Sequence, residues 1–258
     1  MANVQSLERA LHLLNTLSDY PDGLQIARLS EQVGLSKSTT HRLLATLTSM
    51  NYVTKDPDTD RYKLGLQTLY ITRNLINNGN IPKTARPYLK KLSQELNETV
   101  HLCVEDKGEI VYIDKIESNQ TIQMFSRIGS RAPMYSTALG KVLLAGLKDE
   151  QLDQFFKNTP LEAITSHTTT SESKIREEIQ QIKAVHYAID HMENEEHLRC
   201  IAAPIYDQWG KAIASFSVAG PIHRITTERV EQVLIEKVTE CSRVISSQFG
   251  YTTDAAQH

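Results

Sequence analysis

The 258-residue sequence has no long hydrophobic run. No apolar stretch approaches the roughly 20 residues that a membrane-spanning helix needs, and no signal-peptide pattern follows Met1. We therefore expect no membrane association and a cytoplasmic location. Hydrophobic residues make up 40% of the chain and charged residues 23%, which is typical of a globular protein large enough for two cored domains.

Cysteine is scarce. The three cysteines, Cys103, Cys200 and Cys241, are an odd number without paired spacing, which excludes a disulfide framework and a zinc ribbon. The histidines at 186, 191 and 197 match neither an i,i+4 helical pair nor a zinc-finger pattern. We expect reduced thiols, no metal site and no cofactor.

Acidic residues are missing from one stretch near the N-terminus. No Asp or Glu lies between Glu31 and Asp56, and Gly34-Leu35-Ser36 separates two short helical patterns as in a helix-turn-helix. The second helix opens with small hydrogen-bond donors and cations, which suit base edges and phosphates in a major groove. These candidate DNA-contacting residues are Lys37, Ser38, Thr39, His41 and Arg42. An ordinary helical hairpin without acids is the alternative, and the net charge of −3 decides neither way.

The flanking patterns extend this motif. Apolar residues at helical spacing predict a helix over 6–18 and a shorter second helix, and Ser36 is a good N-cap for the third. The first helix is amphipathic, with helical spacing at Leu7, Ala10, Leu11, Leu14 and Leu17, and we expect the third to face inward with Leu43, Leu44, Leu47 and Met50. Two alternating runs around DPDTD then predict a β-hairpin, a wing from which Lys55 and Arg61 reach the DNA backbone or the minor groove.

The segment from 65 to 78 predicts a helix with apolar residues on several faces, which suits a linker helix packed against a dimer partner. Asn77-Asn78-Gly79-Asn80 and Pro82 predict a break after it. We therefore expect a winged helix-turn-helix domain over 1–64, a linker helix over 65–80, a second domain over 81–250, and a disordered tail over 251–258.

The second domain mixes helices and strands. The patterns predict a helix over 85–97, strands over 100–104, 110–116 and 121–128, and a loop over 129–137. Helices follow over 138–146, 149–156 and 171–186, then strands over 200–206 and 212–219, and a last helix over 226–248. A central antiparallel sheet with helices on its faces is an α+β fold.

No catalytic set is evident in this domain. Thr137 to Lys141 resembles a phosphate-binding loop, but Tyr135 and Val142 occupy positions that require glycine and Ser or Thr. What remains is a helix N-terminus whose free N–H groups can bind a carboxylate, or which Ser136 or Thr137 simply caps. Nothing marks Cys200 as an activated nucleophile. We therefore expect this domain to be a ligand-binding module. The alternative is an enzyme that uses Cys200.

Four segments together resemble the IclR-type bacterial transcription regulators, and the resemblance covers nearly the whole chain. They are GLSKSTTHRLL at 34–44, GSRAPMYSTALGKVLLA at 129–145, the paired segments Asp190-His191-Met192-Glu193 and 200–207, and Ser217 to Pro221. The sequence departs from the family pattern at His186, where glycine is usual.

The resemblance implies a winged helix-turn-helix, a linker helix and a GAF-like α/β domain that binds a small organic acid. It also implies homodimers or tetramers on palindromic double-stranded operator DNA. Backbone groups of Ala138 and Leu139 would hold the effector carboxylate. The side chains of Asp190, Cys200 and Ser217 would add polar contacts, and Met124 and Ala132 would line the apolar side. Some members have a second serine where this chain has Ala219, which weakens the case for glyoxylate.

We therefore expect a ligand-responsive regulator, a repressor of a catabolic operon relieved by a 2-oxo acid or a sugar acid. An ionised Asp190 accepts hydrogen bonds and repels a second anion, so it favours an effector with hydroxyl donors, such as 2-keto-3-deoxygluconate. An activator of the same architecture is the alternative.

Overall fold

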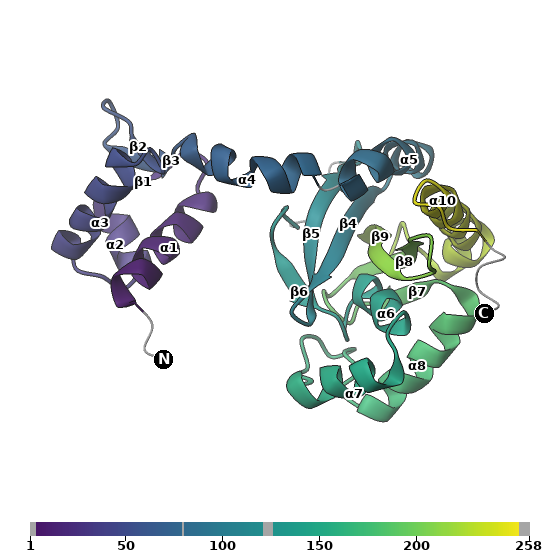
Figure 1. Ribbon diagram of the computed structural model, residues 1–258. Coiled ribbons are helices and arrows are strands. Elements are labelled where there is room, and N and C mark those ends of the chain that lie inside the picture. Colours follow the sequence, from purple (N-terminus) through teal and green to yellow (C-terminus); the bar gives the residue numbers. More distant parts are fainter. Residues whose placement is uncertain (1–3, 79, 121–125, 253–258) are drawn as a thin grey trace. The chain divides into compact units, whose positions relative to one another are not determined.

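The computed structural model describes residues 4–78, 80–120 and 126–252, which form two compact units, Met1–Gly79 and Asn80–His258 (Figure 1). Among the described residues, no helix is both long and apolar enough to cross a membrane. Met124, expected to line an effector site, and all but Tyr251 and Thr252 of the expected tail lie outside the described residues.

The first unit is a winged helix-turn-helix, as predicted. Helices α1 (Gln5–Ser18), α2 (Ile26–Gln32) and α3 (Lys37–Ser49) enclose a core that includes Leu13, Leu29 and Leu44. Strands β2 (Val53–Lys55) and β3 (Arg61–Leu64) form the wing, and the short β1 (Leu24–Gln25), which was not predicted, pairs with β3. Two residues cannot show alternation, so β1 leaves no periodic signal in the sequence.

Met50, which was expected to face inward, is exposed, and so are Leu7 and Leu11 of the apolar pattern in α1. Met50 is 57% exposed because α3 ends at Ser49 and Met50 is its C-cap. On α1 the buried face is formed by Leu13 and Leu17, whereas Leu7 and Leu11 are more than half exposed. Leu7 and Leu11 do recur at helical spacing, but they lie on a second apolar face of α1 and not on the face that packs in the core.

Helix α4 (Gln67–Asn78) follows the wing within two residues of the predicted start. Just before α4 the chain passes close to Asn51, and position 65 requires glycine, because a Cβ there would lie 2.2 Å from the Asn51 carbonyl oxygen. The residues at its start, Leu66, Leu69, Tyr70 and Ile71, are all more than half exposed in the single chain. The expected break after α4 is short, since α5 (Asn80–Leu96) begins at 80 and not at 85. Pro82 lies in the first turn of α5, where its missing N–H costs no helical hydrogen bond.

The second unit contains a six-stranded antiparallel sheet in the order β6-β5-β4-β9-β8-β7. Strands β4 (Thr99–Asp106) and β5 (Glu109–Ile116) form a hairpin, and β8 (Leu198–Tyr206) and β9 (Ala212–Pro221) form another. The edge strands β6 (Arg131–Pro133) and β7 (Ala188–His191) were not predicted. The strand expected over 121–128 lies mostly outside the described residues, and 126–128 are not in a strand.

Helices cover both faces of this sheet (Figure 1). On one face α5 packs with α10 (Ile235–Ser247), which follows α9 (Thr227–Arg229) and a π-helical turn at Val230–Leu234. On the other face lie α6 (Ala138–Ala145), α7 (Asp149–Asn158) and α8 (Glu172–Val185). Alternating residues of β8 serve the two cores: Ile201 and Ala203 face α10, and Ala202 faces α6. The predicted α+β class is confirmed.

Candidate functional site

Helix α3 presents an exposed basic and polar surface in the first unit. Lys37, Ser38, His41 and Arg42 are exposed, and Thr39 is half-buried because its hydroxyl lies 2.9 Å from the Ser36 Oγ. The Ser36 hydroxyl also accepts the Thr39 N–H as the N-cap of α3, and the first turn of α3 contains no acidic residue. The arrangement suits the approach of a phosphate or a base edge.

The wing carries two cations in different electrostatic settings. The Lys55 ammonium lies 2.5 Å from an Asp60 carboxylate oxygen, and this hydrogen bond raises the pKa of Lys55. Arg61 is exposed, and no ion pair of its guanidinium is found among the described residues. The turn between them is closed by Asp56, whose carboxylate accepts the N–H groups of Asp58 and Thr59.

In the second unit, a small cavity opens at the N-terminus of α6 between β4, β8 and β9. It is lined by His101, Tyr112, Ser126, Thr137, Ala138, Leu139, Asp190, Asn194, Glu195, Leu198, Cys200 and Ser217. The structure thus brings together five of the predicted effector-binding residues: Ala138, Leu139, Asp190, Cys200 and Ser217. The cavity measures about 40 Å³, which is room for only a few water molecules.

The two amide groups expected to hold a carboxylate are positioned by a capped helix start. Thr137 Oγ1 accepts the Gly140 N–H at 3.1 Å, and the N–H groups of Ala138 and Leu139 have no acceptor among the described residues. Gly140 lets α6 approach the chain closely, because a Cβ there would lie 2.2 Å from Met134 Cα. Capping by Thr137 and an open anion site therefore coexist at this helix end.

Two strand residues opposite each other present polar groups to the cavity. His101 on β4 is paired in register with Ser217 on β9. The His101 Nε2 lies 2.5 Å from the Ser126 Oγ, and burial, aided by Lys115, lowers the pKa of His101 to about 3. Ser217 Oγ is buried and has no hydrogen-bond partner among the described residues. A neutral imidazole and an unsatisfied hydroxyl therefore face the same space.

Asp190 differs from the expectation of an ionised side chain. Burial raises its pKa to about 7, against the opposing effect of the Glu193 N–H, which its Oδ1 accepts at 2.7 Å. Near neutral pH the carboxyl group is therefore partly protonated and can donate as well as accept a hydrogen bond. A partly protonated Asp190 repels an anionic ligand less than the ionised side chain expected from the sequence.

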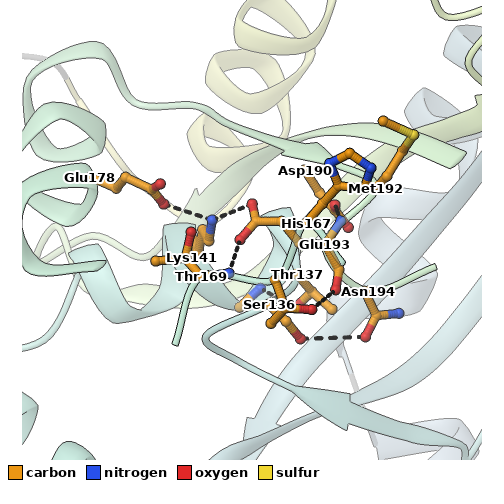
Figure 2. A network of polar contacts seen from close by, with 12 residues as sticks. Ser136, Thr137, Lys141, His167, Thr169, Glu178, Asp190, Met192, Glu193 and Asn194 are labelled. Carbon is orange, nitrogen blue, oxygen red and sulfur yellow. Dashed lines mark hydrogen bonds and ion pairs between the residues drawn. The ribbon is translucent and has the colours of Figure 1, made fainter. Parts of the chain in front are cut away.

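The loop after β7 forms one wall of the cavity and is tied to α6 by a buried ion pair (Figure 2). Lys141 is buried, and its Nζ lies 2.6 Å from both Glu193 Oε1 and Glu178 Oε2. Burial acts to lower the pKa of Lys141, but the two carboxylates outweigh it and raise the pKa. The lysine that resembled part of a phosphate-binding loop is thus a structural cation that positions Asn194 and Glu195.

Cys200 lies beside Asp190 on the neighbouring strand. Burial raises the pKa of its thiol well above the usual value, and Asp190 and Glu195 add to the effect. A nucleophilic cysteine needs the opposite shift, because the thiolate is the reactive species. This environment suits a protonated, polarisable contact for a ligand.

Ala132 is placed differently from the prediction. It lies on β6 opposite Ile110 and packs in the core with Met134, and it does not line the cavity. Sequence reasoning missed seven lining residues: His101, Tyr112, Ser126, Thr137, Asn194, Glu195 and Leu198. Asn194, Glu195 and Leu198 could have been found from their position between Asp190 and Cys200, but nothing in the sequence showed which side of β4 and β5 faces the cavity.

Among the described residues, no group of three or more His, Cys, Asp or Glu side chains could hold a metal ion. His186 ends α8, His191 lies on β7 and His197 follows in the next loop.

Residues 73–247 match the family model described as the C-terminal domain of the bacterial transcriptional regulator IclR. The chain belongs to the IclR family. A second model, described as the IclR helix-turn-helix domain, matches residues 6–57, which include α2, α3, β2 and all but the first residue of α1. Both units of this IclR-family protein thus match the corresponding parts of the family.

Individual relatives agree over nearly full length. The chain is 34% identical to the HTH-type transcriptional regulator KdgR of Escherichia coli over 249 residues, covering 96% of this chain and 94% of that protein. It is 32% identical to the transcriptional repressor IclR of the same species over 231 residues, covering 89% and 84%. The crystal structure of Thermotoga maritima IclR has a TM-score of 0.82 at 30% identity, covering 96% and 100%.

The protein is therefore a DNA-binding transcription regulator with an N-terminal helix-turn-helix. Family membership also implies that a small molecule binds the second unit. The relatives are named as transcription regulators.

Proposed function

We propose that this IclR-family protein represses a catabolic operon and that a small organic acid, bound in the cavity at α6, lowers its affinity for operator DNA. One observation carries the proposal. The free N–H groups of Ala138 and Leu139 open onto the same cavity as the unpaired, buried Ser217 hydroxyl. Helix N-termini attract carboxylates, and a buried hydroxyl without a partner is stabilised by a ligand that bonds to it.

The effector in this proposal is a 2-oxo acid or a sugar acid such as 2-keto-3-deoxygluconate. Away from α6 the cavity is lined by groups that bond to hydroxyls, among them His101, Ser126 and Asn194. Asp190, with a pKa near 7, can serve such a ligand either as acceptor or as donor. Because the cavity measures about 40 Å³, a six-carbon acid requires it to widen, and the loop carrying Asn194 and Glu195 is the wall that we propose moves.

The DNA-contacting residues in this proposal are the predicted ones. Ser38, Thr39 and His41 would read base edges, and Lys37 and Arg42 would bind phosphates or bases in the major groove. Arg61 on the wing would bind the backbone or the minor groove, and Lys55 would do so with its charge partly offset by Asp60. Phosphate contacts fix the register of the protein on the duplex, and base contacts select its sequence.

A second copy of the chain would complete the DNA-binding unit. The exposed apolar side chains of α1 and of the start of α4 are more than expected of a monomer: Val4, Leu7, Leu11, Leu66, Leu69, Tyr70 and Ile71. We propose that a partner subunit covers them, giving a homodimer or a tetramer on a palindromic operator. In this scheme residues 1–64 bind DNA, 81–250 bind the effector, and 65–80 change the spacing of the two winged domains.

The decisive experiment is a mobility-shift titration on the DNA upstream of the protein's own gene, with 2-oxo, aromatic and sugar acids as competitors. We expect one class of acid to weaken the shift. Operator DNA must in turn weaken binding of that acid by the same factor, typically about 5–150-fold in allosteric systems. Transcription in vitro should fall on adding the protein and recover with the acid. No effect of any acid on the shift, or a rise in transcription on adding the protein alone, would overturn the proposal.

Ser217→Ala tests whether the cavity is the site. The variant should keep its operator affinity and lose sensitivity to the acid. Ser173→Ala, an exposed serine on α8 outside the cavity, is the matched control and should respond like the parent protein.

A further inference from the structure

A second cleft lies between α6, α8, the β8–β9 turn and Tyr251, and it shares no lining residue with the effector cavity. Its volume is about 330 Å³, within the range of small-molecule sites. The base is apolar, formed by Val142, Ile182 and Pro204, whereas the walls carry four rings and one ammonium group. The rings belong to His186, Tyr206, Trp209 and Tyr251, and the ammonium to Lys183.

The rings are held in a connected arrangement. Tyr206 and Tyr251 stack with centroids 4.9 Å apart and planes at 30°. His186 meets Tyr206 edge-on at 6.1 Å, and its Nδ1 lies 3.1 Å from the Tyr206 hydroxyl. Trp209, the single tryptophan of the chain, is 78% exposed at the tip of the β8–β9 turn. An aromatic side chain this exposed beside other rings offers a flat surface on which a planar group can stack.

The backbone at His186 supports a role for its side chain. His186 has a φ of 61°, in the left-handed region that glycine adopts without cost. His186 adopts it as the C-cap of α8, where a left-handed residue is common, and its imidazole connects α8 to Tyr206. The ring is therefore held in place at the wall of the cleft by the helix end and by Tyr206.

The ammonium group of Lys183 favours an anionic ligand in the cleft. The Lys183 ammonium lies 3.7 Å from Asp149, whose side chain is 86% exposed, so this pair is weak and its cation remains available. Asp207, which follows Tyr206 in the chain, is engaged by the N–H groups of Trp209 and Lys211, both at 3.0 Å. A ligand carboxylate can therefore approach Lys183 without displacing a buried partner.

We propose that this cleft binds a planar aromatic carboxylate, with its ring against Trp209 and Tyr206 and its carboxylate at Lys183. The site is independent of the effector cavity, and its occupancy does not depend on the proposed effector. The two sites share helix α6, since Val142 and Ala145 line the cleft and Ala138 and Leu139 start the same helix at the cavity. A ligand in the cleft thus contacts the element that presents the carboxylate-binding amides.

Trp209 allows a test on the unlabelled full-length protein, because all tryptophan emission comes from the cleft. Benzoate is the probe, with cyclohexanecarboxylate as the non-planar acid and benzyl alcohol as the uncharged ring. We expect a saturable change in Trp209 emission with benzoate. The two other compounds should bind about tenfold more weakly, the ratio expected for loss of stacking or of one charge-assisted hydrogen bond.

Variants then locate the ligand. Lys183→Met should weaken benzoate about tenfold, and Lys174→Met, an exposed lysine on the same helix, should leave binding unchanged. His186→Gly should also weaken binding, and it relieves backbone strain, so misfolding does not confuse the result. Ser217→Ala in the effector cavity should have no effect.

Two results would overturn the proposal. One is the absence of saturable benzoate binding both in Trp209 emission and in saturation-transfer NMR of the benzoate protons. The other is binding that Ser217→Ala abolishes and Lys183→Met leaves intact, which would place benzoate in the effector cavity.

Discussion

Ser215 and Ser217 lie two residues apart on the same face of β9, both buried, but only Ser215 has a hydrogen-bond partner among the described residues. Ser215 Oγ donates to the Leu139 carbonyl at 2.9 Å and lies 3.0 Å from Cys103 Sγ. Ser217 Oγ faces the cavity instead. One serine of the strand therefore bonds to α6, and the other keeps an unsatisfied hydroxyl in the described part of the chain.

This contrast predicts opposite effects of the same substitution. Ser215→Ala removes a satisfied buried bond and leaves the Leu139 carbonyl without it, so we expect a loss of about 1–2 kcal/mol in the free energy of unfolding. Ser217→Ala removes an unsatisfied hydroxyl, so the free protein should be unchanged or more stable by up to about 1 kcal/mol. Urea denaturation of both variants measures the difference. Equal destabilisation would show that Ser217 already has a partner in the free protein.

Asp190 predicts a pH dependence of stability. Its pKa in the folded protein is about 7, above the usual 3.8, so between these values the folded state binds more protons than the unfolded state. The stability contributed by Asp190 is therefore greatest at low pH and is lost as the pH rises to about 7. Asp190→Asn removes this loss. Its free energy of unfolding relative to the parent should increase between about pH 4 and about pH 7 and then level off, by at most roughly 1.4 kcal/mol per pH unit.

The difference between variant and parent is the quantity to measure, because His101 acts in the opposite sense. Burial and Lys115 lower the pKa of His101 to about 3. Its folded state therefore binds fewer protons than the unfolded state below the usual value of 6.5, and its contribution to stability rises with pH. His101 is present in both proteins and cancels in the comparison. A pH-independent difference would mean that Asp190 keeps an ordinary pKa.

The buried Lys141–Glu193 pair predicts non-additive substitutions. Lys141→Met leaves the Glu193 carboxylate buried without its cation, which typically costs about 3–5 kcal/mol. Adding Glu193→Gln should recover much of this loss, because the remaining partner, Glu178, is partly exposed to water. Lys157→Met, an exposed lysine on α7, should change stability little. Strictly additive losses in denaturation would contradict a direct energetic coupling across the pair.

Hydrophobic periodicity predicted the helices and strands whose own apolar residues recur at a regular spacing. The helices α1, α3, α7 and α8 and the hairpins β4–β5 and β8–β9 were found within a few residues of their expected ends. The short edge strands were not predicted, because their existence depends on a partner. β7 holds only Ala188 to His191, and its pairing with β8 is set by contacts such as Asp190 opposite Cys200.

For the candidate site, the sequence predicted several of the residues but not their electrostatic states. Side chains in the motifs of the family, such as Asp190 and Ser217, were named in advance and meet at one cavity. Their electrostatic states were not predictable, since the pKa of Asp190 depends on burial that only the fold creates. For the same reason Lys141 was read as part of a failed phosphate-binding motif, although it is a buried cation with two carboxylate partners.

The two wing cations, Arg61 and Lys55, should contribute unequally to operator binding. Arg61→Ala should reduce the slope of log affinity against log salt by about 1, uniformly across operator sequences, because in the proposed DNA complex it removes a phosphate contact. Lys55→Ala should reduce it less, since Asp60 at 2.5 Å already offsets the Lys55 charge. His41→Ala should instead change base preference, by about 1–3 kcal/mol at one position. Fluorescence anisotropy over a salt series measures all three, and Lys91→Ala, an exposed lysine on α5, controls for net charge. An equal slope change for Lys55 and Arg61 would show that the Asp60 pair breaks on binding DNA.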